Sequence, residues 1–130
     1  MLANRKATYF MKKILALDNF LVVGSEDCID VMDYEHNTLF KIENLNSVHD
    51  MSYGIIGDGC GGGRLFILEL YAVKVFDFET KEIMEIYTQA EKMYSFSKKG
   101  CDLFITTDER ILKFNLSMMR AEISLIKPIF

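Results

Sequence analysis

The chain has 130 residues, half of them hydrophobic, and a formal net charge of −4. This length supports one modest hydrophobic core, and the apolar content excludes a disordered chain. Basic residues form no run longer than the pairs Lys12 with Lys13 and Lys98 with Lys99. Because phosphate backbones require a clustered positive surface, the sequence predicts no direct binding of nucleic acid.

Neither a membrane span nor a disulfide is expected. No stretch approaches the roughly 20 apolar residues that cross a bilayer, and scattered charges interrupt any signal-peptide core at the N-terminus. Cys28, Cys60 and Cys101 lie far apart, which fits neither a disulfide framework nor a Cys-x-x-Cys metal site. We therefore expect a reducing compartment and an intracellular protein, cytoplasmic or nuclear, with no membrane partner.

Short strands separated by turn residues follow a frayed lead-in at residues 1–8. The first unit is predicted to contain the strands Thr8–Leu17, Phe20–Val23, Ile29–Tyr34 and Thr38–Ile42. The second is predicted to contain Val48–Ile56, Leu65–Leu70, Val73–Phe78 and Ile83–Tyr87. The third is predicted to contain Lys92–Phe96, Asp102–Thr106, Ile111–Leu116 and Ala121–Ile126. Each unit thus provides one small antiparallel sheet.

The three units are copies of one pattern. Asp33, Asp77 and Asn115 fall at one equivalent position, and each directly follows a large apolar residue. The spacings between them are 44 and 38 residues. A period near 40 with several short strands per copy predicts propeller blades rather than a helical repeat.

A family resemblance is carried by the segments FSKKGCDLFITTDERILKFNL (96–116), VVGSEDCIDVMDYEHNTLFKI (22–42) and VKVFDFETKEIMEI (73–86). These segments resemble WD repeats, although the chain has no Trp and lacks the Gly-His pair of that family. The resemblance implies an all-β fold, a partial β-propeller of about three four-stranded antiparallel blades. The expected blades are residues 8–46, 47–90 and 91–127 of a single domain. It also implies a non-enzymatic scaffold that binds other proteins.

The predicted strands are apolar on both faces, so each sheet must be covered on both sides. An open row of three blades leaves two outer faces uncovered, whereas closed rings have about 4 to 8 blades. We expect the ring to be completed by a second copy or by blades of another protein. Two alternatives remain: the chain is a piece of a larger propeller, or it is a compact β-barrel or sandwich that binds a small apolar ligand.

No catalytic, cofactor or metal site is predicted. The pattern Gly57-x-Gly59-x-x-Gly62 matches a dinucleotide fingerprint, but a strand follows where a helix N-terminus is needed. Cys60 on that loop lacks an orienting His. The acidic residues at strand ends fit hydrogen-bonded turns better than the paired carboxylates of a hydrolase.

Tyrosine and methionine side chains are the candidates for contacts with a protein partner. Met118 and Met119 fall in a predicted turn between two strands, where they are expected to be exposed. Tyr53 and Tyr71 are further candidates. The sequence does not identify the partner.

Overall fold

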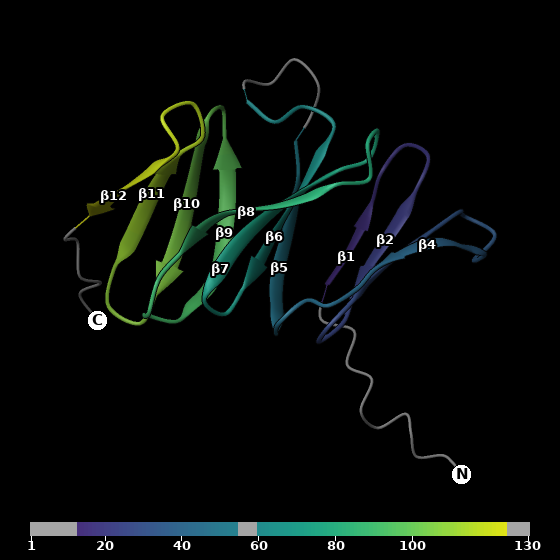
Figure 1. Ribbon diagram of the computed structural model, residues 1–130, viewed down its shortest axis with the longest axis horizontal. Coiled ribbons are helices and arrows are strands. Elements are labelled where there is room, and N and C mark those ends of the chain that lie inside the picture. Colours follow the sequence, from purple (N-terminus) through teal and green to yellow (C-terminus); the bar gives the residue numbers. More distant parts are fainter. Residues whose placement is uncertain (1–12, 55–59, 125–130) are drawn as a thin grey trace, which may run out of the picture.

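The computed structural model describes residues 13–54 and 60–124, and side chains as far as residue 121. In this part of the chain all regular elements are strands, arranged as three sheets side by side (Figure 1). Sheet 1 contains β1 (Lys13–Ala16), β2 (Leu21–Gly24), β3 (Ile29–Met32) and β4 (Thr38–Ile42). Sheet 2 contains β5 (Val48–Tyr53), β6 (Arg64–Glu69), β7 (Ala72–Asp77) and β8 (Ile83–Thr88). Sheet 3 contains β9 (Met93–Lys99), β10 (Asp102–Thr107), β11 (Ile111–Asn115) and β12 (Arg120–Ser124).

Each sheet is an antiparallel meander in which strand order follows chain order. The predicted grouping of four strands per unit is therefore confirmed. The barrel or sandwich alternative is wrong, because the strands of the described residues form three separate four-stranded sheets rather than one closed sheet or two packed ones. Three parts of the predicted strands, residues 8–12, 55–56 and 125–126, lie outside the described residues.

The residues that the repeat placed at one position have one structural role. Asp33 Oδ1 accepts hydrogen bonds from the backbone N–H groups of Glu35 and Asn37 in the β3–β4 turn. Asp77 Oδ1 accepts hydrogen bonds from the backbone N–H groups of Glu79 and Thr80 in the β7–β8 turn. Asn115 Oδ1 accepts one from the backbone N–H of Met118 in the β11–β12 turn. Short side-chain acceptors of this kind fix tight turns.

The core is divided in two by sheet 2. Its second strand, β6, is buried on both faces. Leu65 and Ile67 belong to the cluster shared with sheet 1, whereas Phe66 and Leu68 belong to the cluster shared with sheet 3. A strand with an unbroken apolar run, as in β6, requires cover on both sides, and the neighbouring sheets supply it.

A buried carboxylate links the innermost strands of all three sheets. Asp50 on β5 is 6% exposed. Its Oδ1 lies 3.1 Å from Lys13 Nζ on β1, and its Oδ2 accepts a hydrogen bond of 3.1 Å from the backbone N–H of Phe96 on β9. One side chain of the middle sheet thus holds both neighbours at the point where the sheets converge.

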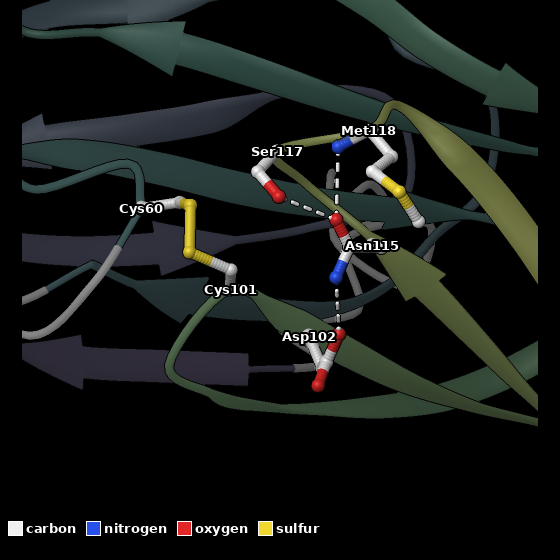
Figure 2. The surroundings of a disulfide bond; sticks show 6 residues. All are labelled: Cys60, Cys101, Asp102, Asn115, Ser117 and Met118. Carbon is white, nitrogen blue, oxygen red and sulfur yellow. Dashed lines mark hydrogen bonds between the residues drawn. A yellow bond between two sulfur atoms is a disulfide. The ribbon is translucent and has the colours of Figure 1, made fainter.

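A disulfide joins Cys60, before β6, to Cys101 in the β9–β10 turn (Figure 2). The prediction that the cysteines form no disulfide is wrong, because spacing along the chain did not show that two loops of neighbouring sheets meet here. The Cα atoms are 4.8 Å apart. Cys28 is the free cysteine, half-buried with Sγ 3.3 Å from Ser25 Oγ. The expectation of a reducing compartment was based on unpaired cysteines, and the disulfide removes that support.

Removing the disulfide should destabilise the fold. Its cysteines are 41 residues apart, and losing a cross-link over a loop of this length costs about 2 to 4 kcal/mol. We expect Cys60→Ser to lower the free energy of unfolding by about that amount in urea titrations without reductant. Cys28→Ser is the matched control and should leave it nearly unchanged. Equal stability of wild type and Cys60→Ser would contradict this account of the cross-link.

The Asp50 carboxylate can be tested with two substitutions. Asp50→Ala should lower the free energy of unfolding by about 1 to 3 kcal/mol, because the buried Phe96 N–H loses its acceptor. Asp50→Asn should cost less, since the amide oxygen can still accept that bond. Thermal and urea denaturation measure both, and an equal loss for the two variants would show that the acceptor is not the cause.

Candidate functional site

A groove of about 380 Å³ lies between sheets 2 and 3, beside the disulfide. The β7–β8 hairpin forms one wall, and the β11–β12 turn contributes to the other. Gly61, which follows Cys60, has a φ of +76° and leaves no room for a side chain against the Phe66 ring. The groove is lined by Gly61, Arg64, Phe66, Val75, Asp77, Thr80, Glu82, Ile83, Met84, Ile86, Leu116 and Met119. Its lining is therefore mainly apolar, with a polar rim.

An ion pair lies on the polar rim of this groove. Arg64 Nε is 3.4 Å from Asp77 Oδ2. Backbone N–H groups of Glu79 and then of Thr80 donate to Asp77 and hold the pKa of its carboxyl below the ordinary value, and Arg64 lowers that pKa further. The Asp77 carboxylate therefore supports the turn and also faces the groove.

Met118 and Met119 are exposed, as the sequence predicts, with 52% and 48% of their surface accessible. Asn115 holds their turn: it accepts from the Met118 N–H at 2.8 Å and donates from Nδ2 to Asp102 Oδ1 at 2.9 Å (Figure 2). Met119 has a φ of +54°, in the left-handed region that non-glycine residues rarely adopt. The turn thus presents two large apolar side chains next to the disulfide, and Met119 lines the groove.

The two predicted tyrosines lie elsewhere. Tyr53 is half-buried, and its ring contacts that of Phe78 edge to face, with centroids 6.0 Å apart. Phe78 packs against the core cluster shared by sheets 1 and 2, so Tyr53 lies on the side of sheet 2 that faces sheet 1. Tyr71 is 45% exposed in the β6–β7 turn, at the opposite end of the hairpins, and lines a depression of about 710 Å³. The four predicted contact residues thus form no single site.

Sheets 1 and 3 each have one outer face, turned away from sheet 2, and the two faces differ. On sheet 1 this face carries the apolar residues Ile14, Leu21, Val23 and Met32, together with the ion pair of Asp30 and Lys41; Ile14 is 60% exposed and Val23 is buried. On sheet 3 Phe104 and Ile111, each 38% exposed, lie among polar side chains. These polar residues are Ser95, Ser97, Thr106 and Lys113. The prediction that both outer faces are apolar is therefore wrong for sheet 3.

Sequence reasoning missed the polar outer face of sheet 3, yet the signal was present. Exposed polar residues lie next to buried apolar ones in both strands: Ser95 and Ser97 flank the buried Phe96 on β9, and Thr106 follows the buried Ile105 on β10. Alternation of this kind indicates a sheet with one solvated face. No comparable signal marked the disulfide.

Within residues 13–54 and 60–124, no group of three or more His, Cys, Asp or Glu side chains is arranged to hold a metal ion. The same part of the chain has no helix with the length and apolar character of a membrane span. The glycine fingerprint at 57–62 falls partly outside the described residues, and β6 follows it at Arg64.

Comparisons with known proteins place this geometry among β-propellers. The N-terminal domain of Nup159 aligns with a TM-score of 0.72 at 9% identity, over 88% of this chain and 33% of that one. The Pan2 WD40 domain of Neurospora crassa aligns with a TM-score of 0.56 at 9% identity, over 86% of this chain and 50% of that one. S. cerevisiae Sqt1 aligns with a TM-score of 0.69 at 10% identity, over 88% of this chain and 33% of that one. No family model matches the sequence, and no curated protein matches it.

The chain therefore has the fold of propeller blades of the WD40 type, and each sheet is one blade. It spans about a third to a half of the length of these structures. At these identities the likeness defines the fold alone.

Asp77 should make stability depend on pH under acidic conditions. Its folded-state pKa lies below the ordinary 3.8, so it contributes stability above that pH, and this contribution is lost as pH falls through the folded pKa. Asp77→Asn keeps an oxygen for the turn but cannot ionise. The difference in unfolding free energy between wild type and Asp77→Asn should therefore shrink as pH is lowered below about 4. A difference that stays constant across this range would contradict the assignment.

Proposed function

We propose that this chain is a non-enzymatic protein-interaction module, in which three blades act as one unit and the open ends of the row bind further blades. The observation that carries the proposal is the row of three blades itself, whose two outer faces receive no cover from the described residues. The covering blades belong to a second copy, to another protein, or to further sequence of a longer chain. In each case the contact surface is the same.

Energetics support binding at these faces. Burying apolar surface stabilises a protein by about 25 cal/mol per Å², so covering a few hundred Å² at each end contributes several kcal/mol. That amount is comparable with the whole stability of a small domain. Closed propellers obtain it from the neighbouring blades on either side.

The structural neighbours support protein partners in general. A structure of S. cerevisiae Dbp5 bound to Nup159 and Gle1 aligns with a TM-score of 0.65 at 11% identity, over 86% of this chain and 34% of that one. Met118 and Met119, and at the opposite end Tyr71, are proposed as additional partner contacts, because they are large and exposed. Tyr53 remains a weaker candidate, being half-buried. An intracellular location also remains part of the proposal.

Photo-crosslinking tests the proposal directly. A benzoyl-phenylalanine at Phe104, on the outer face of sheet 3, should form a defined adduct when the chain is irradiated in its native cells. Tyr34 is the matched control, an aromatic residue with 47% exposure in the β3–β4 turn. Mass spectrometry of the adduct should identify a strand of another blade. If position 104 gives no adduct beyond that of position 34, the outer face binds nothing and the proposal fails.

A further inference from the structure

The two junctions inside the row can be compared position by position, because the turn-capping residues mark equivalent places in the sheets. Phe78 in sheet 2 directly follows the capping Asp77, and Leu116 in sheet 3 directly follows the capping Asn115. Phe78 packs against the core cluster shared by sheets 1 and 2, and Leu116 packs against the cluster shared by sheets 2 and 3. Leu116 thus has in the second junction the place that Phe78 has in the first.

The last strands of sheets 1 and 2 provide a second equivalent pair. Phe40 on β4 pairs with Val31, and Met84 on β8 pairs with Val75. Each valine precedes the capping Asp of its own sheet by two residues. Phe40 and Met84 therefore occupy the same place in the first and second blades.

Aromatic rings fill the first junction at these positions. The ring centroids of Phe40 and Phe78 lie 6.3 Å apart, edge to face, and Nζ of Lys81 in the β7–β8 turn lies 4.9 Å from the Phe40 centroid. A cation at such a distance over an aromatic ring is stabilising. The space between the first two blades thus holds a ring from the preceding blade and a cation from the turn of the following blade.

The second junction has neither rings nor a cation at the equivalent positions. Leu116 and Met84 replace the two rings, and Met84 is 62% exposed. Met119 stands where the first junction has Lys81, four residues after the capping residue, and both have a positive φ, +54° and +61°. Leu116, Met84 and Met119 all line the groove of about 380 Å³. The groove is therefore the space that a ring and a cation occupy in the first junction.

The charges on the rim of the groove favour a basic occupant. Arg64 and Asp77 form an ion pair at 3.4 Å and neutralise each other. Lys98 Nζ lies 6.0 Å from the centroid of the Phe66 ring, but Lys98 does not line the groove. Glu82 lines it and is exposed, and no side chain of residues 13–54 or 60–121 forms an ion pair with it. A lysine or arginine that enters the groove thus meets an unpaired carboxylate.

The backbone of β8 is available beside the groove. Among the described strands, β8 pairs with β7 alone and is an edge of sheet 2. Ile83 and Met84 at its start are 44% and 62% exposed, so the groove is open along this strand. An extended chain can add to such an edge and place alternate side chains in the groove. Small-molecule sites, in contrast, usually enclose most of their ligand.

From this correspondence we propose that the groove binds an extended segment of a partner protein, which inserts an aromatic side chain between Met84 and Leu116 and places a lysine or arginine beside Glu82. The first junction selects this occupant, because Phe40 and Lys81 fill the same space there. The inference rests on the proposed function in taking the occupant to be a protein, and it adds the chemistry of that partner. The groove lies at an internal junction, so its exposure does not depend on the open ends of the row.

Phage display of random linear peptides on the immobilised full chain, without reductant, tests the inference. Enriched peptides should share an aromatic residue with a lysine or arginine as a near neighbour. The double variant Met84→Phe with Leu116→Phe restores the two rings of the first junction and fills the groove. It should therefore weaken binding of the enriched peptides at least about tenfold. Circular dichroism would confirm that the variant is folded.

Charge reversal on the rim gives a second readout that does not depend on repacking the groove. Glu82→Lys should weaken binding of the enriched peptides at least about fivefold and shift a new selection from basic to acidic neighbours. Glu85→Lys is the matched control on the same strand, since Glu85 lines the depression that contains Tyr71, and should change neither result. No enrichment, enriched peptides without the aromatic and basic pair, or binding that is indifferent to Glu82→Lys would overturn the inference.

Two measurements separate this inference from its alternatives. A wild-type dimer in light scattering that the double variant converts to a 15.0 kDa monomer would show that a second copy occupies the groove, and the inference would be wrong. The crosslink at Phe104 reports on the outer face of sheet 3 instead. An adduct there without peptide binding in the groove would support the proposed function and reject this inference. Peptide binding without an adduct would support the inference and reject binding at that open end.

Discussion

Sheet 2 is apolar on both faces, and this constraint organises the molecule. The strand β6 sends Leu65 and Ile67 to one side and Phe66 and Leu68 to the other, and all four are almost fully buried. A sheet of this kind cannot be exposed to water on either side without losing several kcal/mol. The flanking sheets follow from that requirement, and so do the two separate core clusters.

Polar links then fix how the stacked sheets sit. Hydrophobic packing alone is tolerant of sliding, whereas Asp50 ties β5 to Lys13 on β1 and to the Phe96 N–H on β9. At the end of the hairpins that carries the β9–β10 turn, the Cys60–Cys101 disulfide joins sheets 2 and 3 beside the groove. The junction of sheets 1 and 2 has its aromatic contacts instead, with Phe20 stacked on Phe78 at 5.5 Å between centroids. The junction next to Met119 is thus covalently fixed.

What the sequence could predict was local. Asp33, Asp77 and Asn115 recur at a regular spacing because each turn needs a short hydrogen-bond acceptor at one position. This spacing was sufficient to predict the three sheets. The exposure of Met118 also followed from its turn. Tyr53 and the disulfide depend on contacts between sheets. Spacing along the chain carries no information on which side of a blade Tyr53 packs, or on which two loops bring Cys60 and Cys101 together.

The end faces show why counting apolar residues along a strand is not sufficient. In β11 the residues Ile111, Leu112 and Phe114 suggest two apolar faces, but Lys113 lies on the same face as Ile111, and the neighbouring β10 adds Thr106 there. The face of a sheet is a property of four strands in register, so its character emerges only when cross-strand neighbours are read together. Read in that way, sheet 1 presents a face like those buried inside the row, and sheet 3 presents one altered at two positions. Terminal repeats usually have a polar outer face, and sheet 3 differs from that pattern because Phe104 and Ile111 remain apolar there and are each 38% exposed.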